Sequence, residues 1–212
     1  MARFGSVVFD CDSTLSAIEG IDELAGEHHA EIQALTDAAM RGEVPLEEVY
    51  GRRLAIVRPG RERIERVGRR YIEALVPGAP EVIRALHEAR VLVRVLSGGL
   101  RPAVLALTRT LDIRDDDVAA VDILFDADGA YAGFDAGSPL TRAGGKARVL
   151  QGWLSALAGP VLMVGDGVTD LEARPPADMF AAFTGVVARE RVVAAADFVA
   201  ATMDEIGRLV LG

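Results

Sequence analysis

The sequence predicts an α/β protein with a doubly wound parallel sheet and a helical segment inserted after the first strand. Short apolar runs rich in β-branched residues are typical of strands buried on both faces, and amphipathic helical patterns separate these runs. Strands that alternate with helices indicate a parallel sheet covered on both sides. Ligands of such sheets bind at the carboxyl ends of the strands, so the residues that follow each run are the candidate functional residues.

The first expected strand is the run 4–9 (FGSVVF), which ends at Asp10. Further strands are expected at residues 91–96 and 161–164 and, more weakly, at 179–183 and 198–199. Helices are indicated by apolar residues that share one face, namely Val82, Leu86 and Ala89, then Leu100, Val104, Leu107 and Leu111. Residues 126–131 (DADGAY) predict a β-hairpin on an Asp-Gly turn. A calcium loop is the alternative there, but Gly137 stands where such a loop needs an acidic residue.

The stretch from about residue 16 to residue 75 interrupts this alternation, because it contains no convincing strand. Its helical patterns include the stripe Ile64, Val67, Tyr71 and Leu75. Pro45 and the Pro59-Gly60 pair punctuate the stretch, and Pro77-Gly78 ends it. We therefore expect a core made of residues 1–14 and 76–212, with a helical cap of residues 15–75 over the carboxyl end of the first strand.

The composition favours a soluble globular protein. The chain has 212 residues, of which 50% are hydrophobic, so it can form a sizeable core, and disorder is excluded. A formal net charge of −9 disfavours nucleic acid and anionic membranes as partners. The one cysteine cannot form an internal disulfide, and no apolar run approaches the roughly 18 residues that span a bilayer. We expect a cytoplasmic protein that is a monomer or a homodimer.

Lysine occurs once in the chain, at Lys146, and asparagine does not occur. A GC-rich genome explains both facts, since it disfavours the codons of these residues. The alternative is that position 146 needs a compact ammonium, which the planar guanidinium of arginine cannot imitate.

Polar residues follow three of the expected strands: Asp10-Cys11-Asp12-Ser13-Thr14, Ser97-Gly98-Gly99 and Gly165-Asp166-Gly167-Val168-Thr169-Asp170. The carboxyl ends of parallel strands converge, and Lys146 lies on the helical stretch before the last of these strands. Carboxylates gathered so closely repel one another unless a cation is present, and oxygen ligands suit Mg²⁺. The Ser97 hydroxyl, the backbone at Gly98 and Gly99 and the Lys146 ammonium suit a phosphate. Together these groups indicate phosphoryl transfer.

Asp10 and Asp12 are two residues apart, so on an extended strand both side chains point to the same side. One carboxylate can attack phosphorus and form an acyl phosphate. The other, partly protonated, can protonate the leaving group and then deprotonate water. The structural alternative is that either carboxylate caps the following turn through Ser13 or Thr14. The ordered constellation as a whole favours the catalytic interpretation.

These segments resemble the four motifs of the haloacid dehalogenase superfamily. Nearly the whole chain is similar to the phosphoserine phosphatase family, through Glu19-Gly20-Ile21-Asp22-Glu23-Leu24, Arg53-Leu54-Ala55, Gly144-Gly145-Lys146 and Pro175-Pro176-Ala177-Asp178. The sequence departs from the usual family pattern at Cys11, at Leu100 and at Thr169, and none of these departures removes a catalytic group.

The resemblance implies a role for each matching residue. Asp10 is the expected nucleophile and Asp12 the expected acid/base. Mg²⁺ would be held by Asp10, the backbone carbonyl of Asp12 and Asp166, with Asp170 close behind. The phosphoryl group would be bound by Ser97, Gly98 and Lys146, and the rest of the substrate by Glu19, Arg53, Gly99 and Thr169. Within that set Glu19 would meet an ammonium and Arg53 a carboxylate.

The implied activity is Mg²⁺-dependent hydrolysis of O-phospho-L-serine through an aspartyl-phosphate intermediate, the last step of serine biosynthesis. One alternative is a related phosphatase or phosphotransferase that acts on another small phosphorylated metabolite. A second is a catalytically silent binding module, which would not need both Asp10 and Asp12. Cys11 is expected to be buried with a raised pKa, since it lies between two carboxylates. Arg189 either reaches the site from its loop or lies on the surface.

Overall fold

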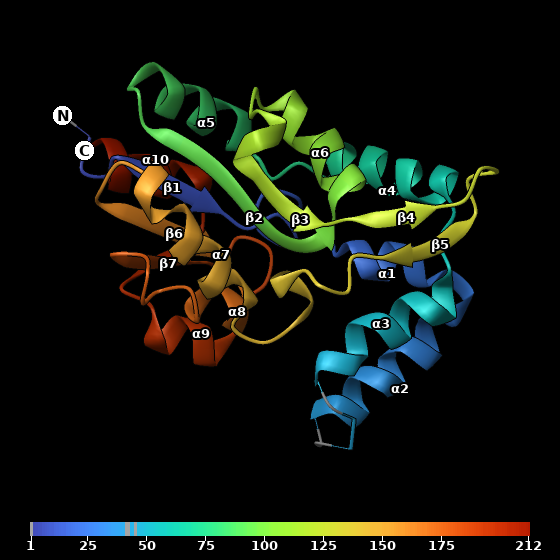
Figure 1. Ribbon diagram of the computed structural model, residues 1–212. Helices are drawn as coiled ribbons and strands as arrows, with labels where there is room; N and C mark the ends of the chain where they lie inside the picture. Colours follow the sequence, from blue (N-terminus) through green and yellow to red (C-terminus); the bar gives the residue numbers. More distant parts are fainter. Residues whose placement is uncertain (1, 41–42, 45) are drawn as a thin grey trace.

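The computed structural model describes residues 2–40, 43–44 and 46–212, and its centre is a six-stranded sheet (Figure 1). The strands are β1 (Ser6–Phe9), β2 (Leu92–Leu100), β3 (Val118–Val121), β6 (Val161–Gly165), β7 (Met179–Phe183) and β8 (Phe198–Ala200). They are ordered β3-β2-β1-β6-β7-β8, and every neighbouring pair is parallel. The strand order therefore reverses beside β1, which confirms the doubly wound prediction and puts the ligand crevice at the end of β1.

Helices cover both faces of the sheet, with α5 and α6 on one side and α7, α8 and α9 on the other (Figure 1). The core helices are α5 (Ala79–Glu88), α6 (Arg101–Thr110), α7 (Gly145–Trp153), α8 (Val168–Leu171), α9 (Glu190–Ala195) and α10 (Met203–Leu211). Successive residues of β1 serve opposite layers, because Val7 and Phe9 belong to the apolar cluster that includes α5, α6 and α10, whereas Val8 packs with Leu150 of α7. All four residues of β1 are buried, as its apolar run predicts.

Two features of the sheet differ from the sequence prediction. Strand β3 was not predicted, because its four residues include two alanines, which have low β-propensity. Strand β2 was expected to end at Leu96, but it continues to Leu100 through a shift in its register with β3. Both differences arise at the edge of the sheet, where pairing with β2 decides the backbone conformation.

Residues 15–75, which we call the insertion, form four helices and no strand longer than a single bridge among the residues described. These are α1 (Gly20–Ala25), α2 (His29–Met40), α3 (Leu46–Val57) and α4 (Arg61–Glu73). Pro45, expected to punctuate the segment, lies outside the described residues. The two ends of the insertion lie side by side, because Ser16 and Leu75 form an antiparallel bridge and the N–H of Val76 donates to the Leu15 carbonyl at 3.0 Å.

A two-stranded antiparallel hairpin, β4 (Ile123–Phe125) and β5 (Tyr131–Phe134), confirms the Asp-Gly turn prediction. Its Gly129 has φ 82°, a conformation that favours glycine. The hairpin packs against the insertion: the Phe134 ring lies 5.4 Å from the ring of Tyr50 on α3, and Arg61 of α4 stacks over Phe125 at 4.7 Å. The remaining helical segments are single 3₁₀ turns at Gly26–His28, Asp115–Asp117, Pro139–Thr141 and Leu154–Ala156.

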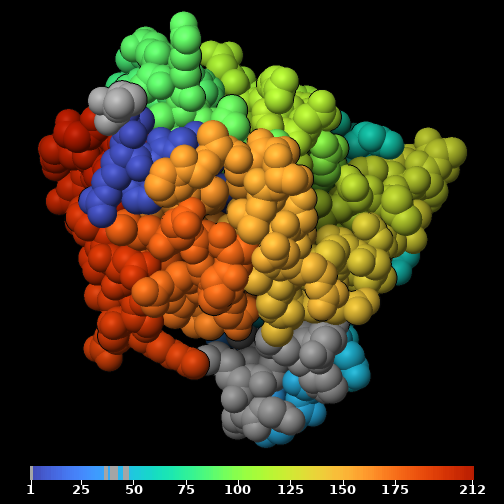
Figure 2. Space-filling model, turned by 60° about the vertical axis from the view of Figure 1, so that its left-hand side comes forward, coloured from blue at the N-terminus to red at the C-terminus, as the bar shows by residue number. Residues whose placement is uncertain are grey.

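The N- and C-terminal segments, dark blue and red in Figure 2, lie side by side on one flank of the molecule. The backbone N–H of Arg3 donates to the carbonyl of Val210 at 2.7 Å, which joins the two segments. Across the described part of the chain, no helix combines the length and the apolarity that a membrane crossing requires.

Candidate active site

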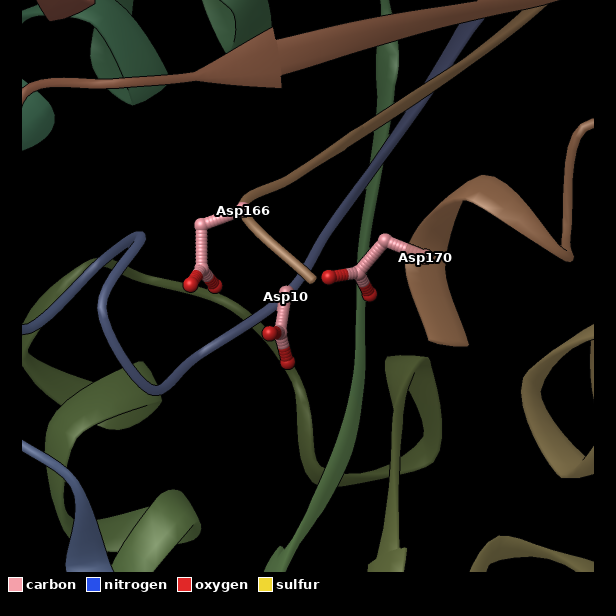
Figure 3. Close-up of side chains that lie close together, drawn as sticks. All are labelled: Asp10, Asp166 and Asp170. Atoms are coloured by element: carbon pink, nitrogen blue, oxygen red, sulfur yellow. The ribbon is translucent and has the colours of Figure 1, made fainter. Parts of the chain in front are cut away.

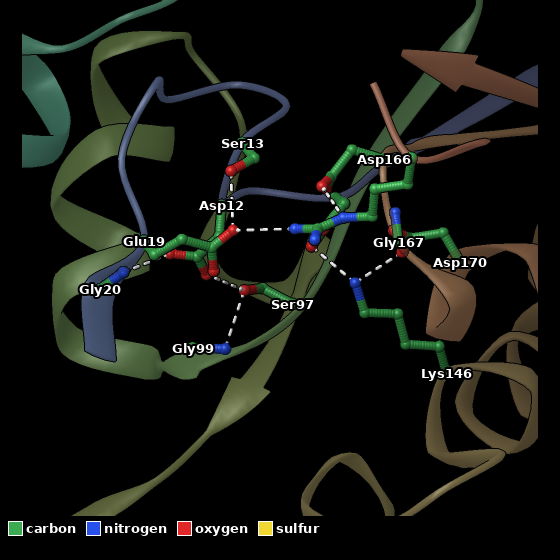
Figure 4. A network of polar contacts seen from close by, with 12 residues as sticks. Asp12, Ser13, Glu19, Gly20, Ser97, Gly99, Lys146, Asp166, Gly167 and Asp170 are labelled. Carbon is green, nitrogen blue, oxygen red and sulfur yellow. Dashed lines mark hydrogen bonds and ion pairs between the residues drawn. The ribbon is translucent and has the colours of Figure 1, made fainter. Parts of the chain in front are cut away.

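Asp10 and Asp12 follow β1, and both line one cavity of about 310 Å³. The Asp12 carboxylate accepts hydrogen bonds from the Tyr71 hydroxyl and from the Gly20 N–H, both at 2.6 Å. The Ser97 hydroxyl lies at 3.5 Å from the other Asp12 oxygen. Asp12 is therefore held by groups from the insertion on one side and from β2 on the other (Figure 4).

The segment Ser97-Gly98-Gly99 closes β2 beside these carboxylates, and helix α6 begins at Arg101. The Gly99 N–H donates to the Ser97 hydroxyl oxygen at 2.9 Å. A side chain at Gly99 would lie 3.1 Å from an Asp12 oxygen and from the Ser97 hydroxyl, so glycine lets the backbone approach Asp12 without displacing these groups. At Gly98 the nearest atom would be 3.9 Å away, because this residue faces the cavity.

Lys146 lies in the first turn of α7 and is 6% exposed. Its ammonium contacts one oxygen of Asp10 and one oxygen of Asp170, both at 2.6 Å. Burial alone lowers the pKa of Lys146, but the two carboxylates outweigh burial and the net shift is upward. The ammonium of the single lysine in the chain thus bridges two carboxylates. This arrangement favours the explanation that position 146 needs a compact ammonium over the explanation from codon usage.

Asp166 and Asp170 come from the end of β6 and from α8. Together with Asp10 they each offer a carboxylate oxygen, and the three oxygens lie within 4.8 Å of one another (Figure 3). The residues fit a hard divalent cation, because the donors are all oxygen and three buried carboxylates need positive charge. Asp170 was expected behind the metal, and here it shares the cluster while the Gly167 N–H donates to its second oxygen at 2.9 Å.

Arg189, whose place the sequence left open, reaches the site. Its Nε donates to Asp166 at 2.9 Å, and a terminal nitrogen lies 3.6 Å from a Glu19 oxygen. The guanidinium therefore joins the sheet side of the site to the insertion. No pattern near Arg189 predicts this contact, because its two partners lie 23 and 170 residues away in the chain.

The insertion contributes Glu19 and Arg53 to the cavity, and Thr169 of α8 also lines it. Glu19 precedes α1 and accepts a hydrogen bond from the Ser13 hydroxyl at 2.7 Å. Burial lowers the pKa of Arg53, and the negative charges of Asp22 and Glu19 oppose this shift.

The apolar part of the cavity lining consists of Ile21, Leu24, Leu54, Ile64, Val67, Leu100, Ala103 and Leu140. Gly98, Gly99 and Lys146 also line the cavity, whereas Ser97, Asp166 and Asp170 are not among its lining residues.

The two carboxylates after β1 have different electrostatic surroundings. Burial raises the pKa of Asp12 to about 6, with Glu19 adding to the shift, whereas the Tyr71 and Gly20 hydrogen bonds oppose it. Burial and Asp170 raise the pKa of Asp10 well above its usual range, and the Lys146 ammonium opposes them. Asp12 can therefore exist in both protonation states near neutral pH, as an acid/base must. Cys11, which lies between Asp10 and Asp12 in the sequence, is buried as expected. Burial, and after it the negative charge of Asp12, raises the pKa of the Cys11 thiol.

Two tyrosines of the site were not predicted as functional residues. Tyr71 was expected only as part of the apolar stripe of α4, but its hydroxyl binds Asp12. Tyr50 of α3 lines the cavity, and its hydroxyl donates to the Gly98 carbonyl at 3.0 Å. A tyrosine within an apolar stripe does carry a signal, because a buried hydroxyl needs a polar partner. Arg142 also lines the cavity and was not predicted.

The known proteins that this chain resembles include hydrolases of phosphate esters, which is consistent with the residues of the site. A model of the haloacid dehalogenase-like hydrolases matches residues 5–178. The phosphoserine phosphatases of Bos taurus and Homo sapiens are 40% and 39% identical over 191 residues, covering 88% of this chain and 84% of each relative. A structure described as a phospho-aspartyl intermediate analogue of phosphoserine phosphatase has a TM-score of 0.76 at 25% identity, covering 97% of this chain and 98% of that chain. The chain therefore belongs to the haloacid dehalogenase-like hydrolases and, within them, to the phosphoserine phosphatase family.

Proposed function

We propose that this protein hydrolyses O-phospho-L-serine to L-serine and phosphate, the last step of serine biosynthesis. The observation that carries the proposal is that Asp10, Asp12 and Lys146 line the same cavity as an acid and a base of the insertion, Glu19 and Arg53. Phosphoserine carries an ammonium and a carboxylate at one end and a phosphate at the other. The names of the relatives support the same substrate.

Asp10 is the proposed nucleophile. One of its oxygens attacks phosphorus and forms an aspartyl phosphate, while the bond from phosphorus to the seryl oxygen breaks. Asp12, in its protonated form, gives its proton to that oxygen and L-serine leaves. The Asp12 carboxylate then takes a proton from water, whose oxygen attacks the aspartyl phosphate, so that phosphate is released and Asp10 is restored.

The remaining core residues bind and orient the phosphoryl group. The Ser97 hydroxyl, the backbone N–H of Gly98 and the Lys146 ammonium would donate to its oxygens, where negative charge develops in the transition state. Lys146 bridges Asp10 and Asp170, so its positive charge lies beside the nucleophile before substrate binds.

The proposed cofactor is Mg²⁺, held by Asp10, the backbone carbonyl of Asp12 and Asp166, with Asp170 adjacent. When bound, the ion would neutralise charge on the phosphoryl oxygens and on the nucleophile. The acidic cluster around Asp10 supports this assignment. We further propose that residues 15–75 act as a cap that selects the substrate, in a cytoplasmic enzyme that is a monomer or a homodimer.

Substrate choice is tested by phosphate release from a panel of small phosphate esters, with and without Mg²⁺. Arg53→Ala and Glu19→Gln should lower kcat/KM for phosphoserine by about 10- to 150-fold, the cost of a lost charged hydrogen bond. Both variants should hydrolyse p-nitrophenyl phosphate almost normally, since it lacks the ammonium and the carboxylate. Arg52→Ala is the matched control, because Arg52 is exposed on the same helix and pairs with Glu48 outside the cavity.

Asp10→Asn should abolish turnover of every ester in the panel. Equal losses on both substrates for Arg53→Ala, or better turnover of another ester than of phosphoserine by the parent, would reassign the protein to a related phosphatase or phosphotransferase.

A further inference from the structure

We propose that Tyr50 is a positioning residue, which orients the peptide group between Gly98 and Gly99 from across the cavity. The inference deepens the proposed phosphatase function. Tyr50 belongs to α3 of the insertion, whereas the peptide that it contacts closes β2 of the core. Its hydroxyl donates to the Gly98 carbonyl oxygen at 3.0 Å.

The carbonyl of Gly98 and the N–H of Gly99 belong to the same planar peptide unit and point in opposite directions. When the Tyr50 hydroxyl holds the carbonyl, the N–H is directed to the other side, where it donates to the Ser97 hydroxyl oxygen at 2.9 Å. The Ser97 hydroxyl, which accepts from Gly99, donates its own hydrogen toward Asp12, whose oxygen lies at 3.5 Å. A single peptide plane thus connects the insertion with Ser97 and Asp12.

This peptide needs an external contact because glycine lies on both sides of it. Two glycines in sequence allow a wide range of backbone angles, so rotation of the plane between them meets little steric resistance. The space around Gly98 is also open, since a side chain there would find its nearest neighbour 3.9 Å away. The hydrogen bond from Tyr50 supplies the restraint that the local sequence lacks.

Tyr50 is itself held in place. Its ring lies 5.4 Å from the Phe134 ring at an interplanar angle of 53°, a tilted arrangement that aromatic pairs favour. Burial, followed by the charge of Asp12, raises the pKa of Tyr50, so the hydroxyl remains a hydrogen-bond donor. The hairpin therefore supports Tyr50 from behind while the hydroxyl faces the core.

The test is Tyr50→Phe, which removes one oxygen atom and keeps the ring on Phe134. With p-nitrophenyl phosphate, kcat should fall by about 3- to 10-fold, the usual range for one hydrogen bond, while KM changes by less than about twofold. The same loss is expected with phosphoserine, because the peptide orients Ser97, which would bind the phosphoryl group that both esters share. Tyr131→Phe is the matched control, since Tyr131 lies on the hairpin, where its ring meets Arg58 outside the cavity.

Hydrogen exchange of the Gly99 amide, measured by NMR without substrate, separates positioning from a general loss of stability. In Tyr50→Phe this amide should exchange about tenfold faster, whereas amides in the central strands keep the rates of the parent. Unchanged Gly99 exchange, or kcat within twofold of the parent with p-nitrophenyl phosphate, would overturn the inference. Failure of the parent to hydrolyse phosphoserine would overturn the proposed substrate alone, since neither the amide measurement nor p-nitrophenyl phosphate depends on it.

Discussion

Burial makes the ionised form of the Asp12 carboxylate unfavourable in the folded protein. Its pKa is raised by burial from 3.8 to about 6. The native state therefore binds the proton more tightly than the unfolded chain does, and unfolding between these pH values releases it. The favourable contribution of this proton is complete below pH 3.8 and is lost as the pH rises through about 6.

We therefore expect Asp12→Asn to stabilise the metal-free protein at pH 7 while abolishing turnover. The gain in the free energy of unfolding should be about 1–3 kcal/mol, since each pKa unit corresponds to about 1.4 kcal/mol. Urea unfolding at pH 7 and pH 4 in a chelator measures it, and the gain should shrink at pH 4, where the parent is protonated. Asp116→Asn, an exposed aspartate of the Asp115–Asp117 turn, controls for the loss of one negative charge. An equal gain at both pH values would contradict the linkage.

Side chains at strand ends could be predicted from the sequence, because a parallel sheet brings such ends together whatever the details of the loops. Asp10 and Asp166 directly follow strands, Ser97 lies in the last residues of β2, and Lys146 was noticed as the only lysine. Tyr50 and Arg189 could not be placed, since their polar partners come from segments 48 and 23 residues away. Their positions depend on how the insertion and the last loops pack, which the local pattern does not contain.

At the scale of elements, the contact between α4 and α6 fixes the insertion against the core. Gly68 of α4 faces Ala106 of α6, and a side chain at Gly68 would lie 2.8 Å from the Ala106 methyl carbon. Real carbon atoms do not approach so closely, so the absence of a side chain sets the spacing of the two helices.

Gly68→Ala should therefore push the helices apart and lower the free energy of unfolding by about 1–3 kcal/mol. Chemical denaturation measures the loss, and Ala106→Gly in the same protein should restore part of it. Gly152→Ala on α7 is the control, because nothing lies within 4 Å of the added carbon and the helix gains up to about 1 kcal/mol. Additive losses in the double variant would show that the two positions do not interact.

Helices and strands could be predicted where the apolar pattern of the segment itself determines its structure. The bounds of β7 agree with the predicted run 179–183. Three residues of the predicted stripe, Ile64, Val67 and Tyr71, lie on the buried face of α4, whereas Leu75 lies beyond the end of that helix and forms a bridge with Ser16. Strand β3 was missed because Val118–Val121 has only four residues, two of them alanine, and becomes a strand through its pairing with β2. Whether such an edge segment forms a strand depends on pairing with a segment distant in the sequence.

At the scale of the whole molecule, the net charge of −9 and the cluster of Asp10, Asp166 and Asp170 predict a stability that depends on divalent cations. An ion that binds only the folded state stabilises it, by about 2.7 kcal/mol at 100 times its Kd. Thermal unfolding should therefore shift upward when Mg²⁺ replaces a chelator at constant ionic strength. Asp166→Asn should reduce the shift, and an undiminished shift in that variant would place the ion elsewhere.

The neighbouring ends of the insertion, at Ser16 and Leu75, make that segment a module in the evolutionary sense. A stretch that leaves and rejoins the core at one point can be lengthened, shortened or exchanged without altering the order of the strands. Recombination at these two positions could thus transfer a new specificity to an old reaction centre in a single event. The chemistry would be inherited with the sheet, and the choice of substrate with the exchanged stretch.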